Sequence, residues 1–103
     1  MTAAGAKDVN KKVLVGPAEG WEGWVMRLFT FAPGGHTPKH SHPWPHINYI
    51  VAGKGILYLD GKEHEVTAGS IAYIPGGKEH QFRNISESDE FAVICIVPEE
   101  GEK

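Results

Sequence analysis

The sequence predicts a single all-β domain, a sandwich or barrel built from about eight short strands. The chain has 103 residues, which allows one domain with one hydrophobic core. It contains 13 glycines and seven prolines without low-complexity sequence, and turn signals recur about every 8–12 residues, as in sandwiches and barrels. No segment sustains a 3.6-residue periodicity, so we expect little or no helix.

The first two expected strands follow a polar arm. Residues 1–11 are small and polar, and we expect a loose N-terminal arm there. Residues 12–15 are the first expected strand, which a Gly-Pro pair ends. Residues 24–31 are the second strand, with alternate side chains on one face. The Pro-Gly-Gly sequence of residues 33–35 predicts a turn at its end.

Turns separate the six remaining strands, and four of the five connections contain glycine. The strongest signal is Asp60-Gly61, because Asp-Gly between two extended runs favours a tight hairpin. It joins the expected strands 56–59 and 62–66. The other expected strands lie between further turn residues and cover residues 46–51, 71–74, 80–83 and 91–97.

Charge and composition exclude several classes of partner. The formal net charge is −3, and no basic patch stands out, so we expect neither nucleic-acid nor membrane binding. No apolar run approaches the length of a membrane span, and the N-terminus lacks a signal-peptide pattern. Cys95 is the single cysteine and cannot form an internal disulfide, which suits a reducing compartment. We therefore expect a cytoplasmic protein.

Four of the six histidines form a pattern typical of a metal site. His40 and His42 are two residues apart, so an extended backbone places both side chains on the same face. His46 follows after a Pro-Trp-Pro corner, and His80 must be brought in by the fold. Imidazole suits zinc, copper, iron and nickel, and also permits manganese. Three histidines within seven residues favour a shared ion over four unrelated side chains.

Two longer motifs contain these histidines. Residues 34–53 read G-x5-H-x-H-x3-H-x6-G, and residues 69–84 read G-x5-P-x-G-x2-H-x3-N. They resemble the two signature motifs of the cupin superfamily, except that His46 stands where the pattern has glutamate. The chain also resembles small single-domain four-histidine manganese cupins of thermophilic prokaryotes, over about residues 25–98. This resemblance implies one domain over 1–103, a double-stranded antiparallel β-barrel (jelly roll), a metal in one mouth, and a homodimer.

The resemblance also implies one divalent ion per chain, with manganese first and iron second. Nickel, copper and zinc remain compatible with imidazole ligands. Four neutral ligands leave the ion its full charge, so it should attract anions better than a site with a carboxylate. Octahedral coordination would leave two positions open for chemistry. Tetrahedral zinc would be saturated and purely structural.

Strand parity and the resemblance outline a candidate substrate pocket. Its members share the face of the metal ligands and are Arg27, Phe29, Phe82, Val93 and Cys95. For the apolar members and the cysteine, ordinary barrel core is the competing interpretation. Arg27 has two alternatives: it pairs with a surface carboxylate, or it receives an anionic substrate, because an unpaired buried arginine is costly.

Three functions remain open from the sequence. The leading hypothesis is a metal-dependent oxidoreductase, dioxygenase-like, acting on a small anionic or enolisable organic molecule. No carboxylate lies in the ligand segments to serve as a general base, which disfavours hydrolysis. The alternative is a non-catalytic binding or sensing module in which the metal organises the pocket. A structural zinc site in an interaction protein is the third.

Overall fold

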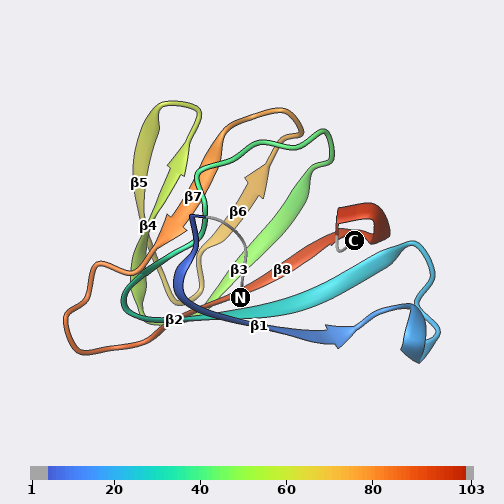
Figure 1. The fold of residues 1–103 in the computed structure, drawn as a ribbon, viewed down its shortest axis with the longest axis horizontal. Helices are drawn as coiled ribbons and strands as arrows, with labels where there is room; N and C mark the ends of the chain where they lie inside the picture. The colour runs from blue at the N-terminus through green and yellow to red at the C-terminus, as the bar shows by residue number, and fades with distance from the viewer. Residues whose placement is uncertain (1–4, 102–103) are drawn as a thin grey trace.

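The computed structural model describes residues 5–101, which form a curled antiparallel β-barrel (Figure 1). The strands are β1 (Lys7–Val15), β2 (Trp24–His36), β3 (His46–Ala52), β4 (Lys54–Leu59), β5 (Lys62–Thr67), β6 (Ile71–Ile74), β7 (His80–Arg83) and β8 (Phe91–Pro98). Two 3-10 turns, Pro17–Glu19 and Glu99–Gly101, are the helical segments of the described residues. Neither is long and apolar enough to cross a membrane. The predicted all-β class with little helix is confirmed.

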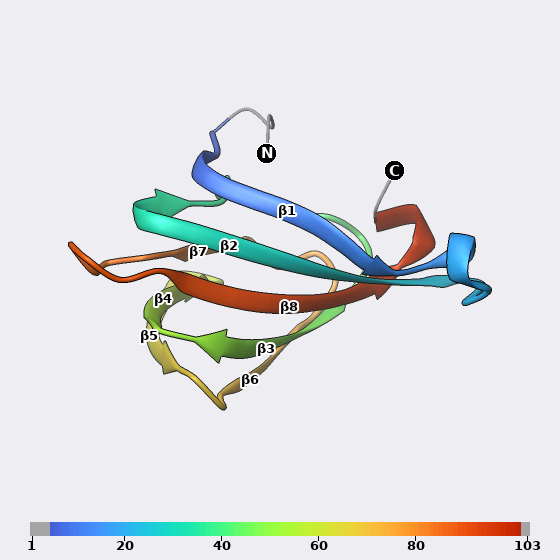
Figure 2. The same cartoon turned by 90° about the horizontal axis from the view of Figure 1, so that it is seen from below.

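The sheet has the strand order β5-β4-β7-β2-β8-β3-β6, and β1 pairs with β2. The two ends of this path are consecutive in the chain, because the turn of residues 68–70 joins β5 to β6. That turn also bonds to β3, since the Gly69 N–H donates to the Ile50 carbonyl at 2.8 Å. The sheet therefore curls round so that its two ends meet, and it forms a barrel. Figure 2 shows the long strands β1, β2 and β8 on one side, with β3, β4, β5 and β6 facing them.

The N-terminal strand is longer than the sequence indicated. β1 begins at Lys7, so residues 7–11 are strand and the prediction of a loose arm is wrong there. Polar side chains concealed this strand, but its pairing with β2 comes from the backbone, as between Lys11 and Phe29. Val9 is buried on the inner face. Residues 1–4 of the expected arm lie outside the described residues.

β2 also continues past its expected end. The Pro-Gly-Gly sequence is a bend within the strand, because Gly34 adopts φ +78°, which glycine tolerates without strain. Gly35 packs so closely on β1 that a Cβ atom would lie 2.5 Å from the Asp8 carbonyl oxygen. The continuation brings His36 beside Arg83 of β7. The long β2 thus connects both sides of the barrel.

The interior combines an apolar core with a few polar side chains. Its largest fully buried members come from β2, β3, β6 and β8 and are Phe31, Phe91, Ile50, Ile74, Val25, Val93, Val97 and Cys95. The buried polar side chains among the described residues are His46, Asn48, His80 and Asn84. Asn84 donates to the carbonyls of Phe31, Ala32 and Asp89, at 3.1, 3.2 and 2.7 Å. The other three belong to the site described below.

Candidate metal centre

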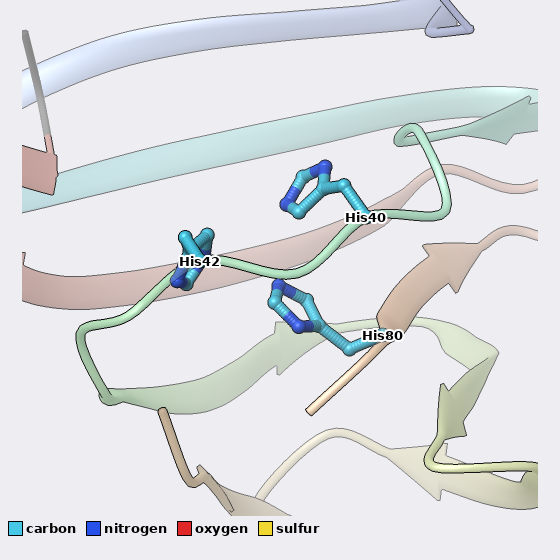
Figure 3. Close-up of side chains that lie close together, drawn as sticks. All are labelled: His40, His42 and His80. Carbon is cyan, nitrogen blue, oxygen red and sulfur yellow. The ribbon is translucent and has the colours of Figure 1, made fainter. Parts of the chain in front are cut away.

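The fold brings histidines from two distant segments together. His40 and His42 lie in the connection between β2 and β3, His46 opens β3, and His80 opens β7. A pair of backbone hydrogen bonds joins the segments: the His40 N–H donates to the His80 carbonyl at 3.1 Å, and the His80 N–H donates back at 2.8 Å. Figure 3 shows the rings of His40, His42 and His80 turned toward one another.

All four histidines expected as ligands lie at this place. One ring nitrogen from each of His40, His42 and His80 lies within 4.8 Å of the others, so these three could hold a metal ion. His46 adjoins this group: its Nε2 is 3.2 Å from Nε2 of His80. Its ring centroid is 5.2 Å from that of His42.

Hydrogen bonds determine which nitrogen of three rings carries the proton. Nδ1 of His42 lies 2.9 Å from the Trp44 carbonyl, and Nδ1 of His80 lies 2.9 Å from the Lys78 carbonyl. Nδ1 of His46 lies 2.5 Å from Oδ1 of Asn48. Since these oxygens only accept, each Nδ1 donates and each Nε2 keeps a lone pair. This is the form in which histidine binds a metal.

The contact between His46 and His80 tests whether a metal ion fits. Both Nε2 atoms carry lone pairs, so their 3.2 Å approach is repulsive in the absence of a positive charge between them. Nitrogens that each lie about 2.1 Å from one ion are separated by about 3.0–3.4 Å for angles between 90° and tetrahedral. The observed separation falls in this range. The residues therefore fit a shared divalent ion.

Burial keeps three of the rings neutral. Burial lowers the pKa of His46 to about 3, although its bond to Asn48 acts in the opposite direction. Burial likewise lowers the pKa of His80 to about 4. The pKa of His40 is lowered by burial first, and then by the nearby His42 and Arg27. Neutral imidazoles with free lone pairs are ready to bind a cation without first releasing a proton.

A cavity of about 630 Å³ adjoins the histidines. It is lined by all five residues expected for the pocket, which are Arg27, Phe29, Phe82, Val93 and Cys95. Lining residues that the sequence reasoning missed are Lys11, Phe31, Thr37, Ser41, Asn48 and Gly101. Strand parity with His46 could have indicated Asn48, whereas the loop and turn residues carried no such signal. Among the described residues that line it, none is acidic.

Arg27 lies on the cavity side of β2. Its guanidinium carbon is 4.9 Å from the ring centroid of Phe29, and its Nη2 donates to Sγ of Cys95 at 3.2 Å. The same sulfur is 3.6 Å from Nδ1 of His46. Trp44 stacks on His42, with centroids 4.8 Å apart and planes 12° from parallel. A cation and aromatic walls thus surround the histidines.

The small antiparallel barrel and the histidines from two motif segments together indicate the class of proteins to which this chain belongs. The family described as Cupin domain (Cupin_2) matches residues 27–97, and the chain belongs to this family. The predicted membership of the cupin superfamily is confirmed.

Individual relatives differ in their described roles. The chain is 34 % identical over 80 residues to auxin-binding protein T85 of Nicotiana tabacum, covering 68 % of this chain and 43 % of that protein. It is 30 % identical over 76 residues to an oxalate-binding protein of Thermotoga maritima, covering 69 % of this chain and 63 % of that protein. The chain therefore spans less than two thirds of either relative.

A solved structure is similar over nearly the whole chain. The polyketide cyclase RemF of Streptomyces resistomycificus superposes with a TM-score of 0.87 at 29 % identity, covering 95 % of this chain and 70 % of that one. One barrel thus occurs in proteins with unlike functions, so function must be argued from the site.

Proposed function

We propose that this chain is a metal-dependent oxidoreductase, dioxygenase-like, with a mononuclear four-histidine site and a small organic substrate. One divalent ion per chain would be held by His40, His42, His46 and His80, with manganese preferred and iron second. The observation that carries the proposal is the convergence of lone-pair nitrogens beside a cavity whose described lining has no carboxylate. A bound redox-active ion supplies Lewis-acid and electron-transfer chemistry there.

The chain's own residues supply binding and exclusion of water. Phe29, Phe82 and Val93 provide an apolar wall against which the carbon skeleton of a substrate packs. Arg27 and Lys11 also line the cavity and favour a substrate that carries a negative charge. Because no acidic side chain of the described lining can take a proton, a hydrolytic mechanism has little support.

Metal content and electron spin resonance of protein purified without added metal test this function. About one manganese or iron per chain, with water ligands that exchange, supports it, as does oxygen consumption that depends on the ion. Stoichiometric zinc without an exchangeable ligand would mean that the site is a structural zinc site and that the protein is not an oxidoreductase. Protein that takes up no metal would overturn the site itself.

The names of two relatives favour a second candidate, a non-catalytic module that binds a small molecule. The similar proteins from tobacco and Thermotoga maritima are described as auxin-binding and oxalate-binding. In this case the ion and Arg27 hold an anionic ligand that is not converted. Thermal-shift screening with organic anions, followed by analysis of the compounds after incubation, separates the two. Stabilisation with full recovery of the ligand indicates binding alone.

We also propose that the protein is a cytoplasmic homodimer. Its single cysteine, Cys95, is buried and suits a reducing compartment. The dimer surface is the outer face of β3 and β6, where large apolar side chains are 43–73 % exposed. These are Ile47, Tyr49, Val51, Ile71 and Tyr73. Ile47 lies beside Tyr73 and Tyr49 beside Ile71, so the patch is continuous.

The size of this patch supports a second copy as its partner. With ordinary side-chain areas the five residues expose roughly 600 Å², the upper end for a monomer. A stable interface needs about 800 Å² from each partner, and a two-fold axis pairs the patch with itself. Sedimentation equilibrium should show a dimer, and Tyr73→Glu should give monomers. Ile85→Lys, at another exposed apolar residue, is the control, and a monomeric wild type would overturn the proposal.

A further inference from the structure

Asn48 is a buried polar side chain next to the candidate ligands. It is 2 % exposed and lies two residues after His46 on the inward face of β3. Its neighbours across the sheet are Ala72 on β6 and Cys95 on β8. A buried amide between strands costs free energy unless its polar atoms have partners. Its Oδ1 accepts from Nδ1 of His46 at 2.5 Å, which is the contact that explains its place here.

His46 differs from two other histidines of the site in how it is held. His42 and His80 donate to the backbone carbonyls of Trp44 and Lys78, which any residue at those two positions would supply. His46 donates to a side chain. The other described neighbour of its Nδ1 is Sγ of Cys95 at 3.6 Å, and sulfur is a weak acceptor. The protonation of the His46 ring therefore depends on one amide oxygen.

Removal of this acceptor has a specific structural consequence. Nε2 of His46 faces Nε2 of His80 at 3.2 Å, and the second nitrogen carries a lone pair because Nδ1 of His80 donates to Lys78. Without Asn48, the ring of His46 gains a hydrogen bond by moving its proton to Nε2. That proton would then point at His80 and occupy the space between the two nitrogens.

We propose that Asn48 is a positioning residue that holds His46 in its Nδ1–H tautomer, so that Nε2 is presented as a metal ligand. This inference rests on the metal site of the proposed function. The choice of an amide has a second effect. An aspartate would bind the ring more strongly but would add a negative charge to a cavity whose described lining has none. The neutral amide leaves the positive charge of the ion available to an anion.

The tautomer can be measured without any metal. Long-range 15N–1H correlation spectra of the chelator-treated protein distinguish the protonated from the unprotonated nitrogen of each ring. The wild type should show His46 protonated at Nδ1. Asn48→Leu, which has a similar volume and no acceptor, should show protonation at Nε2. Gln81→Leu is the matched control: it removes an amide that donates to the Thr37 carbonyl, just past the end of β2, but touches no ligand ring.

Metal binding provides the second measurement. Loss of a hydrogen-bonding partner of a ligand typically weakens metal binding 10–100-fold. Asn48→Leu should show this loss of Mn²⁺ affinity in a competition with a chelator, and the spin-resonance spectrum of its bound Mn²⁺ should be altered. Gln81→Leu should keep the wild-type affinity and the wild-type spectrum. Asn48→Asp should bind Mn²⁺ at least as tightly as wild type, with several-fold weaker binding of azide to the loaded protein.

The outcomes separate this inference from the proposed function. Asn48→Leu that keeps the Nδ1–H tautomer, the wild-type affinity and the wild-type spectrum overturns the positioning role alone. Azide binding by Asn48→Asp equal to wild type overturns the role of the neutral amide. If Asn48→Leu does not fold by circular dichroism, Asn48→Ala, which also lacks an acceptor, carries the same tautomer test. A wild type that binds no metal refutes the proposed function, while its tautomer remains readable in the metal-free spectra.

Discussion

Acidification of the metal-free protein from pH 7.5 to pH 5.5 should lower its free energy of unfolding by about 3 kcal/mol. In the unfolded chain, histidine has a pKa of about 6.5 and takes up a proton in this interval. In the barrel, burial lowers the pKa of His46 to about 3 and of His80 to about 4, so both stay neutral. The unfolded state binds more protons, and acid therefore favours unfolding.

The magnitude follows from the unfolded state. Between pH 7.5 and pH 5.5 each of the two histidines contributes about 1.4 kcal/mol, the value of one pH unit per proton, because pH 5.5 lies one unit below the unfolded pKa. The lowered pKa of His40 adds a change of the same sign. The total change is a large part of the free energy of unfolding of a typical domain, which is about 5–15 kcal/mol. Most carboxyl groups stay ionised above pH 5.5, so they contribute little in this interval.

Urea unfolding in the presence of a chelator, followed by circular dichroism at both pH values, measures this difference. His46→Asn should remove about 1.4 kcal/mol of the pH-dependent loss, whereas Gln81→Leu, which removes no titratable group, should leave the loss unchanged. A free energy of unfolding that is the same at both pH values, or higher at pH 5.5, would refute the assignment of buried neutral histidines.

Three substitutions test other parts of the structure. His42→Ala and His80→Ala should each weaken Mn²⁺ binding at least about 10-fold by calorimetry, because each removes a proposed ligand itself and not merely a residue that orients one. Gly76→Ala should weaken binding and lower the melting temperature, since its Cβ would clash with the Pro43 carbonyl and displace the loop that carries His42. Asn84→Ala should lower the free energy of unfolding by about 2–4 kcal/mol in urea while Mn²⁺ affinity stays constant, because three backbone carbonyls lose their donor.

The strand pattern could be predicted because turns and alternation are local properties. The Asp60-Gly61 hairpin shows this, with both residues at positive φ as a tight turn requires. The start of β1 could not be predicted, because an edge strand is held by the backbone of its neighbour and its polar side chains show no pattern. The continuation of β2 through Gly34 also depends on that pairing.

For the site, spacing indicated the histidines but not what holds them. The approach of His40 to His80 depends on a bridge between segments far apart in sequence. The oxygens that orient His42 and His80 belong to the backbone of Trp44 and Lys78, and any residue there would provide them. A side-chain pattern contains no information about such contacts. Asn48 is different, since its two-residue spacing from His46 was visible in the sequence.

The backbone bridge between His40 and His80 has a consequence for chain entropy. An unfolded chain would have to close a loop of about 40 residues before these two rings could share an ion, at a cost of about 4 kcal/mol. The barrel has already closed this loop. Loop closure alone would therefore make the affinity of an ion for the folded chain about 10³-fold higher than for the unfolded chain. Folded protein would then accumulate as free metal rises above the dissociation constant. The supply of metal would thereby set how long each molecule survives unfolding and proteolysis.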